Sequence, residues 1–426
     1  MEALKTIGKA WKIPDIRKKI IFTLLMLVVF RIGSNIPVPG INRDILDQAF
    51  NGDSGLFELF DLFSGGAFSN LTIFALSITP YITASIVLQL LTIAIPALER
   101  LAKEGVEGRK KIARYTRYLT VALAFVQAIG MTLGIFKQYL LNTDFFHITV
   151  VVFVLSAGTA FLMWLGELIN EHGIGNGISL IIFGGIVARV PSAVMAAYSN
   201  YKSGAISLVG IFLFLAFAIL VIIVIIEIQQ GQRRIPVQYA KRVVGRKMYG
   251  GQSTHIPLKV NQAGVIPVLF GMSLLQLPQT LVYFWPNTGF SEFMTKWLST
   301  NGTPGVYVYS VFYAILIIFF TYFYTAVTFN PMEVADNMKA NGGFVPGIRP
   351  GRPTVEYLQK VMNRITFTGA IFLAVIAVMP LIIGNFTAID FKFGGTSLLI
   401  AVGVALDTMK QLENQMVMRN YQGFLK

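Results

Sequence analysis

The sequence contains no cysteine and few charged residues. Of its 426 residues, 54% are hydrophobic and only 13% are Asp, Glu, Lys or Arg. The missing cysteines exclude disulfide frameworks and thiolate metal sites. The three histidines, His147, His172 and His255, lie too far apart in the chain to form a metal-ligand motif. Because soluble domains carry about twice this charged fraction, the composition indicates a membrane protein.

Catalytic signatures are also missing. The chain has no HExxH, no GxSxG and no phosphate-binding glycine loop followed by lysine. The pair Glu171 and His172 stands beside glycines at the end of a predicted helix, where a capping or turn role is favoured over catalysis. We therefore predict a protein that is not an enzyme and that needs no cofactor or metal.

Apolar runs recur along the chain. A helix needs about 20 apolar residues to cross a bilayer core, and ten nearly uncharged runs approach that length. They lie at residues 20–36, 71–95, 118–136, 145–165, 173–188, 207–226, 260–285, 306–328, 365–383 and 393–406. The runs at 173–188 and 393–406 are short and begin among glycines, which in transporters and channels points to a central site. The alternative is that both are ordinary helices with snorkelling ends.

The basic residues are distributed asymmetrically between these runs. All but seven of the 35 Lys and Arg residues fall in segments 1–19, 96–118, 231–262, 327–364 and the C-terminal segment. The seven others are Arg31, Arg43, Lys137, Arg189, Lys202, Lys296 and Lys392. By the positive-inside rule, both termini are cytoplasmic.

Two internal echoes indicate related halves. Pro80 is followed nine residues later by Gln89, and Pro267 nine residues later by Gln276, each glutamine lying between two leucines. The stretches Gly177–Ile182 and Gly395–Ile400 are similar as well. With five helices per half, the second copy crosses the membrane in the opposite direction. The halves are therefore predicted to form an inverted repeat around a central site.

Aliphatic residues recur at helical spacing within the echoed runs. Ile78, Ile82 and Ile86 follow each other at i, i+4, and Ile178 and Ile182 do the same. Core packing explains this pattern equally well. The functional interpretation is a hydrophobic constriction that excludes ions by dewetting. Ionisable residues near the midplane, which a coupled transporter would need, are nearly missing.

Two segments outside the spans have unusual compositions. Residues 55–68 include LFELFDLFSGGAF, which is too short to span and too apolar for water. It predicts a small helix in the outer mouth of a pore, and a helix lying on the outer interface is the alternative. Residues 1–19 carry Leu4, Ile7 and Trp11 on one helical face among lysines. This pattern indicates an amphipathic helix on anionic lipid, or alternatively a disordered basic tail.

Two basic cytoplasmic loops complete the pattern. Residues 231–262 alternate apolar and polar side chains and predict a β-hairpin. Residues 327–364 contain the sequence GIRPGRP, in which Pro and Gly stiffen the backbone. A charged segment is usually just a solvated surface, but a stiff loop presenting arginines also fits docking on phosphates or an acidic protein.

Several runs together resemble the SecY family, the central subunits of the bacterial protein-conducting channel. They are FALSITPYITASIVLQLL, FLMWLGE, GIGNGISLIIFGGIVA, GQRRIPVQYAKR, QSTHIPLKVNQAGVIP, FNPMEVADNMK, GFVPGIRPG and FGGTSLLI. The resemblance extends from Lys5 to the C-terminal tail. It implies an all-α membrane protein of ten helices in two halves, helices 1–5 and 6–10, around an hourglass pore.

The resemblance also assigns roles to residues. The pore ring falls on Ile78, Ile82, Ile178, Ile182, Leu269 and Ile400. The plug falls on residues 55–68, including Leu56, Phe57, Leu59, Phe60, Phe63, Gly65 and Gly66. A lateral gate between helices two, three, seven and eight includes Ile86, Gln89, Gln127, Ser273 and Gln276. Docking residues are Lys241, Arg242, Arg246, Lys247, Arg349 and Arg352, of which Arg349 matches the family's functionally critical arginine.

The implied partners are SecE, SecG, the motor ATPase SecA, the ribosome with its RNA, and secretory or membrane proteins with signal sequences. We expect a multi-pass protein of a bacterial plasma membrane. Its predicted parts are an N-terminal helix at 1–19, halves at 20–190 and 207–411, an external hinge loop at 191–206 and a tail at 412–426. The rival interpretations are a secondary transporter, which needs a polar midplane site, and a scaffolding membrane subunit without conductance.

Overall fold

The computed structural model describes most of the chain. The described residues are 8, 10–41, 64–134, 136–204, 207–239, 242–244, 247–249, 253–282, 288–298, 304–384 and 395–423. The plug residues Leu56, Phe57, Leu59, Phe60 and Phe63, together with Lys241 and Arg246, lie outside this part.

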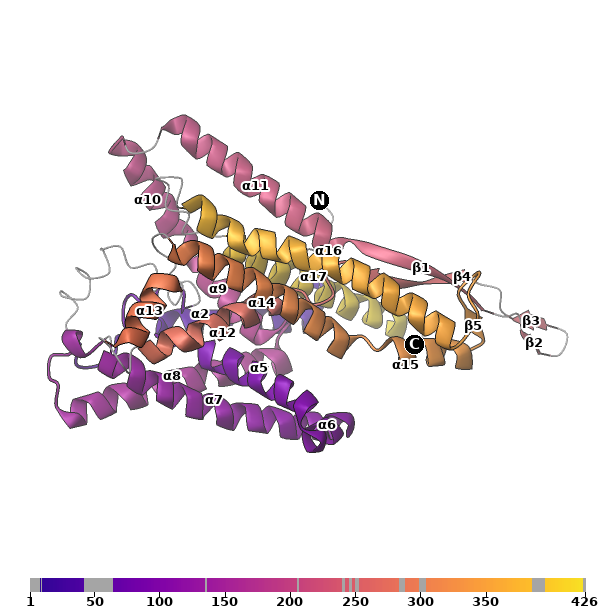
Figure 1. Ribbon diagram of the computed structural model, residues 1–426, viewed down its shortest axis with the longest axis horizontal. Coiled ribbons are helices and arrows are strands. Elements are labelled where there is room, and N and C mark those ends of the chain that lie inside the picture. The colour runs from indigo at the N-terminus through magenta and orange to yellow at the C-terminus, as the bar shows by residue number, and fades with distance from the viewer. Residues whose placement is uncertain are drawn as a thin grey trace.

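The fold is a bundle of long helices with a small sheet at one end (Figure 1). The first half contains α2 (Pro14–Gly33), α5 (Thr79–Ala94), α6 (Pro96–Lys103), α7 (Val106–Gly134), the 3-10 helix η1 (Phe136–Tyr139), α8 (Phe145–His172), α9 (Gly177–Ala188) and α10 (Val190–Lys202). The second contains α11 (Leu208–Gln230), α12 (Ile266–Val282), α13 (Gly289–Trp297), α14 (Gly305–Thr328), α15 (Pro331–Ala340), α16 (Arg352–Gly384) and α17 (Gly395–Gly423). Helices α5, α7 and α8 lie on one side of the bundle and α14, α16 and α17 on the other (Figure 1).

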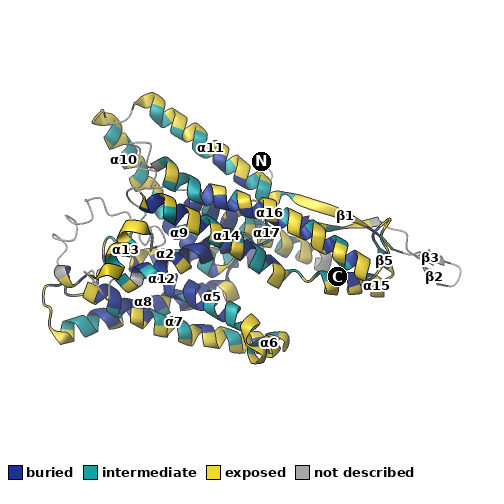
Figure 2. Cartoon of the chain, in the orientation of Figure 1, coloured by how far each residue is buried: buried dark blue, intermediate teal, exposed yellow. Residues whose placement is uncertain are grey.

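Each of the ten predicted apolar runs contains a helix. By length and composition, six helices of the described part can cross a membrane, and the pair α5 and α6, bent by 101°, is a seventh candidate. Their outward faces are apolar: α11 exposes Leu208, Phe212 and Ile219, and it is coloured mostly as exposed or intermediate in Figure 2. Large exposed apolar side chains on this scale belong in lipid rather than water. The chain is therefore a multi-pass membrane protein.

The second predicted span is only partly helical, which corrects the prediction of a helix from residue 71. Residues 71–78 are a buried irregular segment with positive φ at Leu71 (45°) and Ser77 (53°). Their backbone groups bond outside any helix: Val38 N–H donates to Leu71 O and Ile73 N–H donates to Ile36 O, each at 3.0 Å. The helix α5 starts only at Thr79, where Pro80 occupies a position that needs no N–H donor.

Three helices extend into segments that were predicted to be other elements. Helix α2 begins at Pro14 rather than at residue 20, again with a proline in its first turn. The predicted external loop at 191–206 is largely helix α10. The apolar run at 393–406 is short, but α17 continues to Gly423 and takes up most of the predicted tail. The helix persists because a helix can extend beyond the bilayer into water while its apolar run ends.

The predicted β-hairpin at 231–262 is confirmed. Strand β1 (Gln232–Tyr239) pairs antiparallel with β4 (Ser253–Lys259), and β2 (Arg242–Val244) pairs with β3 (Lys247–Tyr249) at the tip. Strand β5 (Gly343–Phe344), from the basic loop at 327–364, pairs with the other edge of β1 through Gln238 and Tyr239. The two basic loops therefore share one sheet, which the sequence did not predict.

Candidate functional site

The six predicted ring residues lie together in the largest hydrophobic cluster of the described chain. Five of them are buried, with exposed fractions of 1% for Ile78, Ile182 and Ile400, 8% for Ile82 and 9% for Leu269. Ile178 is partly buried and packs against the same cluster. Ile78 is the N-cap residue of α5, and the other five lie in α5, α9, α12 and α17, among which α5 contacts α12 and α9 contacts α17. The fold thus places six branched aliphatic side chains from both halves in one apolar core.

The internal echoes correspond to matching positions in these helices. Pro80 is the second residue of α5 and Pro267 the second residue of α12. Likewise Gly177 is the first residue of α9 and Gly395 the first of α17. The repeated residues therefore start the four helices that carry the ring.

A polar cavity adjoins this cluster. Its volume is about 440 Å³. It is lined by Val265 and Val404, which belong to the same hydrophobic cluster as the ring residues, and by polar residues of α17 and of segment 259–266. Gln229 Nε2, Asn261 Oδ1 and Gln262 Oε1 lie buried there without a hydrogen-bond partner in the described chain. The polar lining makes this cavity suitable for water rather than for lipid. The sequence analysis missed these three residues: Gln229 lies in the last turn of α11, and Asn261 and Gln262 lie just before α12.

The predicted gate residues lie where the two halves meet. Ile86 of α5, Gln127 of α7, and Ser273 and Gln276 of α12 are all buried, and Gln89 is half-buried. Helix α12 contacts both α5 and α7. Polar side chains buried at a helix seam make it easier to separate than a seam that is purely apolar, because each can exchange its partner for water. The assignment as a gate stays a prediction.

The end of the predicted plug is held tightly. Gly65 and Gly66 have φ of 65° and 91°, in the left-handed region that favours glycine. Arg31 of α2 donates from Nη1 to the Gly65 carbonyl oxygen at 2.9 Å. A Cβ at Gly65 would lie 2.6 Å from Gly185 Cα of α9. Both glycines are therefore required where this turn crosses α9.

Four of the predicted docking residues lie in the described part of the chain, in the tip strands or shortly after β5. Arg349 and Arg352 are exposed, and Arg352 pairs with Glu356 at 3.6 Å. The Thr354 hydroxyl donates to the Arg349 carbonyl at 2.9 Å, which fixes the loop. The backbones of Arg242 and Lys247 lie in the tip strands β2 and β3.

A separate small hydrophobic core packs these two loops together. Ile235 and Val237 of β1 pack with Met338 of α15, Val345 and Leu358 in a cluster separate from that of the membrane helices. Since residues of both loops contribute to this core, we expect the hairpin and the Arg349 loop to present one rigid surface.

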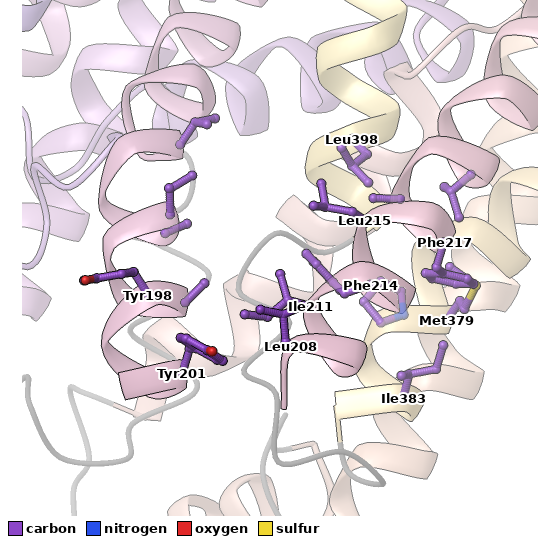
Figure 3. A pocket seen from close by; sticks show the side chains of 17 residues that line it. Tyr198, Tyr201, Leu208, Ile211, Phe214, Leu215, Phe217, Met379, Ile383 and Leu398 are labelled. Carbon is purple, nitrogen blue, oxygen red and sulfur yellow. The ribbon is translucent and has the colours of Figure 1, made fainter. Parts of the chain in front are cut away.

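A second, almost entirely apolar cavity lies between α10 and α11. It has a volume of about 630 Å³ and is lined by α10, α11, α16 and α17. In Figure 3, Tyr198 and Tyr201 of α10 stand across from Leu208 and Ile211 of α11. Such a lining suits hydrocarbon or another apolar helix better than water.

Known proteins resemble this chain over nearly its whole length. The family model described as SecY matches residues 72–409. The protein translocase subunit SecY of Streptomyces coelicolor is 49% identical over 449 residues, which cover 99% of this chain and 100% of that protein. The protein translocase subunit SecY of Aquifex aeolicus is 47% identical over 428 residues, 98% of each chain.

Solved structures share the fold at low identity. One described as "The structure of a protein conducting channel" superposes with a TM-score of 0.67 at 19% identity, over 96% of this chain and 97% of that one. Another, "Sec61 in the Canine ribosome-channel complex from the endoplasmic reticulum", gives a TM-score of 0.63 at 18% identity over the same shares.

Proposed function

This chain belongs to the SecY family, and from that premise we propose how its residues let a polypeptide pass. It is a protein-conducting channel. The observation that carries the mechanism is the burial of Ile78, Ile82, Ile182, Leu269 and Ile400 in one cluster next to a polar cavity. An unfolded chain enters the polar cavity and then parts the aliphatic ring, which closes behind it.

The ring suits this task because of its chemistry. Aliphatic side chains make no hydrogen bonds that a passing chain would have to break, and they bend by rotamer changes around side chains of different size. In the resting state they leave no space for water, so ions cannot cross. Residues 55–68 are proposed to plug the outer mouth, and the fixed turn at Gly65 and Gly66 supports an anchored C-terminal end for that plug.

The seam of α12 against α5 and α7 is the proposed lateral gate. A signal sequence or membrane segment of about 20 apolar residues leaves through it into lipid. Burial of its apolar surface in hydrocarbon drives this step, at about 25 cal/mol per Å². Two halves, 20–190 and 207–411, would separate there while remaining joined through α10.

Energy for transport is proposed to come from outside the chain, which we take to have no enzymatic activity of its own. The exposed Arg349 and Arg352, in the loop after β5 and at the start of α16, support docking of the ribosome and of SecA. The apolar cavity between α10, α11, α16 and α17 supports a membrane helix of SecE at the hinge. SecG is a further expected subunit, the membrane is a bacterial plasma membrane, and both termini face the cytoplasm.

A crosslinking experiment tests the pore assignment. Because the chain has no cysteine, single substitutions Ile82→Cys and Ile400→Cys place a unique thiol in the ring, and Leu155→Cys places one in a separate buried cluster as a control. A stalled secretory chain carrying a photo- or thiol-reactive group should crosslink to both ring positions and not to the control. Failure at both ring positions, with the stalled chain shown to be inserted, would contradict the pore.

A further inference from the structure

Helix α13 (Gly289–Trp297) is too short to cross a bilayer and lies at the end of the bundle away from the sheet (Figure 1). In the chain it follows α12 and precedes α14, and it contacts both of these helices. None of the pore, gate or docking residues proposed above belongs to it. In the proposed orientation, this end of the bundle is the outer side of the membrane.

Both ends of α13 are held by hydrogen bonds. The Thr288 hydroxyl accepts from the Ser291 N–H at 3.4 Å, which caps the first turn. Gln279 of α12 donates from Nε2 to the carbonyl oxygen of Leu298 at 3.1 Å, just past the last turn. The Leu298 side chain also packs against the large hydrophobic cluster of the membrane helices. The helix is therefore fixed to α12, and each of its faces has a definite direction.

Around its axis α13 presents three sectors. The first faces the bundle and contains the half-buried residues Ser291, Met294 and Leu298. The second is aromatic, at i, i+3 and i+7, with exposed fractions of 39%, 52% and 39% for Phe290, Phe293 and Trp297. The third is polar and exposed, and it contains Glu292, Thr295 and Lys296. At 3.6 residues per turn each sector borders the other two, which suits a helix that meets protein, lipid and water at once.

The length of α12 places α13 near the edge of the hydrocarbon core. Helix α12 has 17 residues, which corresponds to a rise of about 26 Å. A bilayer core is roughly 30 Å thick. Because α13 is bonded to Gln279 in the last turn of α12, it lies close to the boundary between acyl chains and headgroups rather than far out in water.

Other exposed aromatic side chains lie at this end of the bundle. Helix α10, at the same end in Figure 1, exposes Tyr198 and Tyr201, and α14 exposes Tyr307 in its first turn. Tyr and Trp are enriched at the boundary between hydrocarbon and headgroups, because their rings are apolar at one end and form hydrogen bonds at the other. The aromatic sector of α13 has the same composition, and it belongs to a helix that packs beside the lipid-facing α14.

We propose that α13 is an interfacial anchor, whose aromatic sector inserts between the headgroups and acyl chains of the outer leaflet while its polar sector faces water. The partner is the lipid surface itself. Since Gln279 and Leu298 fix α13 to α12, the anchor holds the outer end of one side of the proposed gate in the membrane. The assignment to the outer leaflet rests on the proposed channel function, whereas insertion of the aromatic sector can be measured without it.

Tryptophan fluorescence measures this insertion. The chain has four tryptophans, Trp11, Trp164, Trp285 and Trp297, and changing the first three to Phe leaves Trp297 as the reporter in the aromatic sector. The matched control moves the reporter by one residue into the polar sector, with Lys296→Trp and Trp297→Phe in the same background. A chain with all four tryptophans changed to Phe gives the background signal of the partner subunits, which is subtracted.

Each variant is purified with its partner subunits and placed in vesicles of phosphatidylcholine and phosphatidylglycerol, with or without bromine on the acyl chains. Brominated chains should quench Trp297 about threefold more strongly than the reporter at residue 296, and iodide in the water should quench them in the reverse order. Transport of a precursor protein by the same vesicles is recorded separately, so a failure of the anchor and a failure of the channel are seen apart.

Two results would overturn the anchor. Equal quenching of the two reporters by brominated lipid would show that α13 does not present its aromatic sector to the bilayer. Protection of Trp297 from both bromine and iodide would show that protein, such as a partner subunit or a second copy of this chain, covers the sector instead of lipid.

A substitution within the sector gives a second measurement. The rings of Phe293 and Trp297 contact each other, with centroids 6.5 Å apart. In the chain that keeps only Trp297, Phe293→Ser should lower quenching of Trp297 by brominated lipid about twofold, because the inserted face loses one of its three apolar side chains. Phe293→Leu keeps that face apolar and should be quenched like the parent, and thermal unfolding of both variants checks the fold. Equal quenching of the two variants would contradict insertion of the sector as a unit.

Discussion

A polar substitution in the ring gives the sharpest test of how the channel excludes ions. Ile182 of α9 is 1% exposed and packs in the cluster with Ile82, Leu269 and Ile400. The change Ile182→Asn removes an aliphatic side chain and introduces an amide that has no partner in a dry core. Both effects act against the closed state, because the amide is satisfied only if water enters.

The size of the effect follows from burial. Burying an isoleucine side chain fully contributes about 1.5–3 kcal/mol, and a buried polar group without a partner costs about 1–3 kcal/mol. The dry closed state should therefore lose about 3 kcal/mol or more relative to a hydrated one. Since about 1.4 kcal/mol corresponds to a tenfold change, the hydrated fraction should rise about a hundredfold.

The assay is ion flux from vesicles containing the purified channel without motor or substrate. Two controls separate sealing from folding. Ile182→Val keeps the site apolar and should leak less than a tenth as much as Ile182→Asn. Leu155→Asn introduces the same amide at a residue of α8 that is 0% exposed but lies in another cluster, and it should not leak. Equal leak from Ile182→Asn and Leu155→Asn, or no leak from either, would refute the proposal that the aliphatic ring excludes ions.

Other substitutions test the remaining proposals. Gln127→Leu makes the buried seam more apolar and should stabilise the closed gate by about 1 kcal/mol. Export of precursors with weak signal sequences should fall several-fold, and export of precursors with strong signal sequences should change little. Equal effects on both classes of precursor would argue against a gate. Arg349→Glu reverses an exposed charge without breaking the hydrogen bond from the Thr354 hydroxyl to the Arg349 carbonyl. Binding of the motor and of the ribosome should weaken strongly in low salt, while ion leak through the resting channel should not change. Arg352→Glu is the matched comparison. Gly158→Ala places a Cβ against the Ile73 carbonyl oxygen and should destabilise the fold by about 1–3 kcal/mol, seen as a lower melting temperature, whereas Gly289→Ala, with open space around it, should melt like the parent.

The sequence alone was enough for the membrane class and for the places of the helices. Apolar runs report directly on burial in lipid, because lipid-facing residues must be apolar whatever their neighbours are. That Ile78, Ile82, Ile178 and Ile182 share one apolar cluster was also predictable, since they recur at helical spacing; their role as a pore ring stays a prediction. The helix starts were less predictable, because the apolar runs begin at residues 71, 260, 173 and 393 and the helices begin later, at Thr79, Ile266, Gly177 and Gly395.

Only the tertiary structure decided what residues 71–78 and 173–177 do. The first segment looks like part of an apolar helix, but its backbone bonds go to Ile36 and Val38, partners that no local pattern reveals. The glycines of the second segment look like flexible helix starts, yet each is needed because another helix lies within the space of a side chain: α2 at Gly173, α17 at Gly175 and α8 at Gly177. Hydropathy and spacing report the solvent around a residue and its contacts with near neighbours in the chain. Close approach between helices far apart in sequence depends on the packing of the whole bundle, and it is this packing that makes the glycines of the turn necessary.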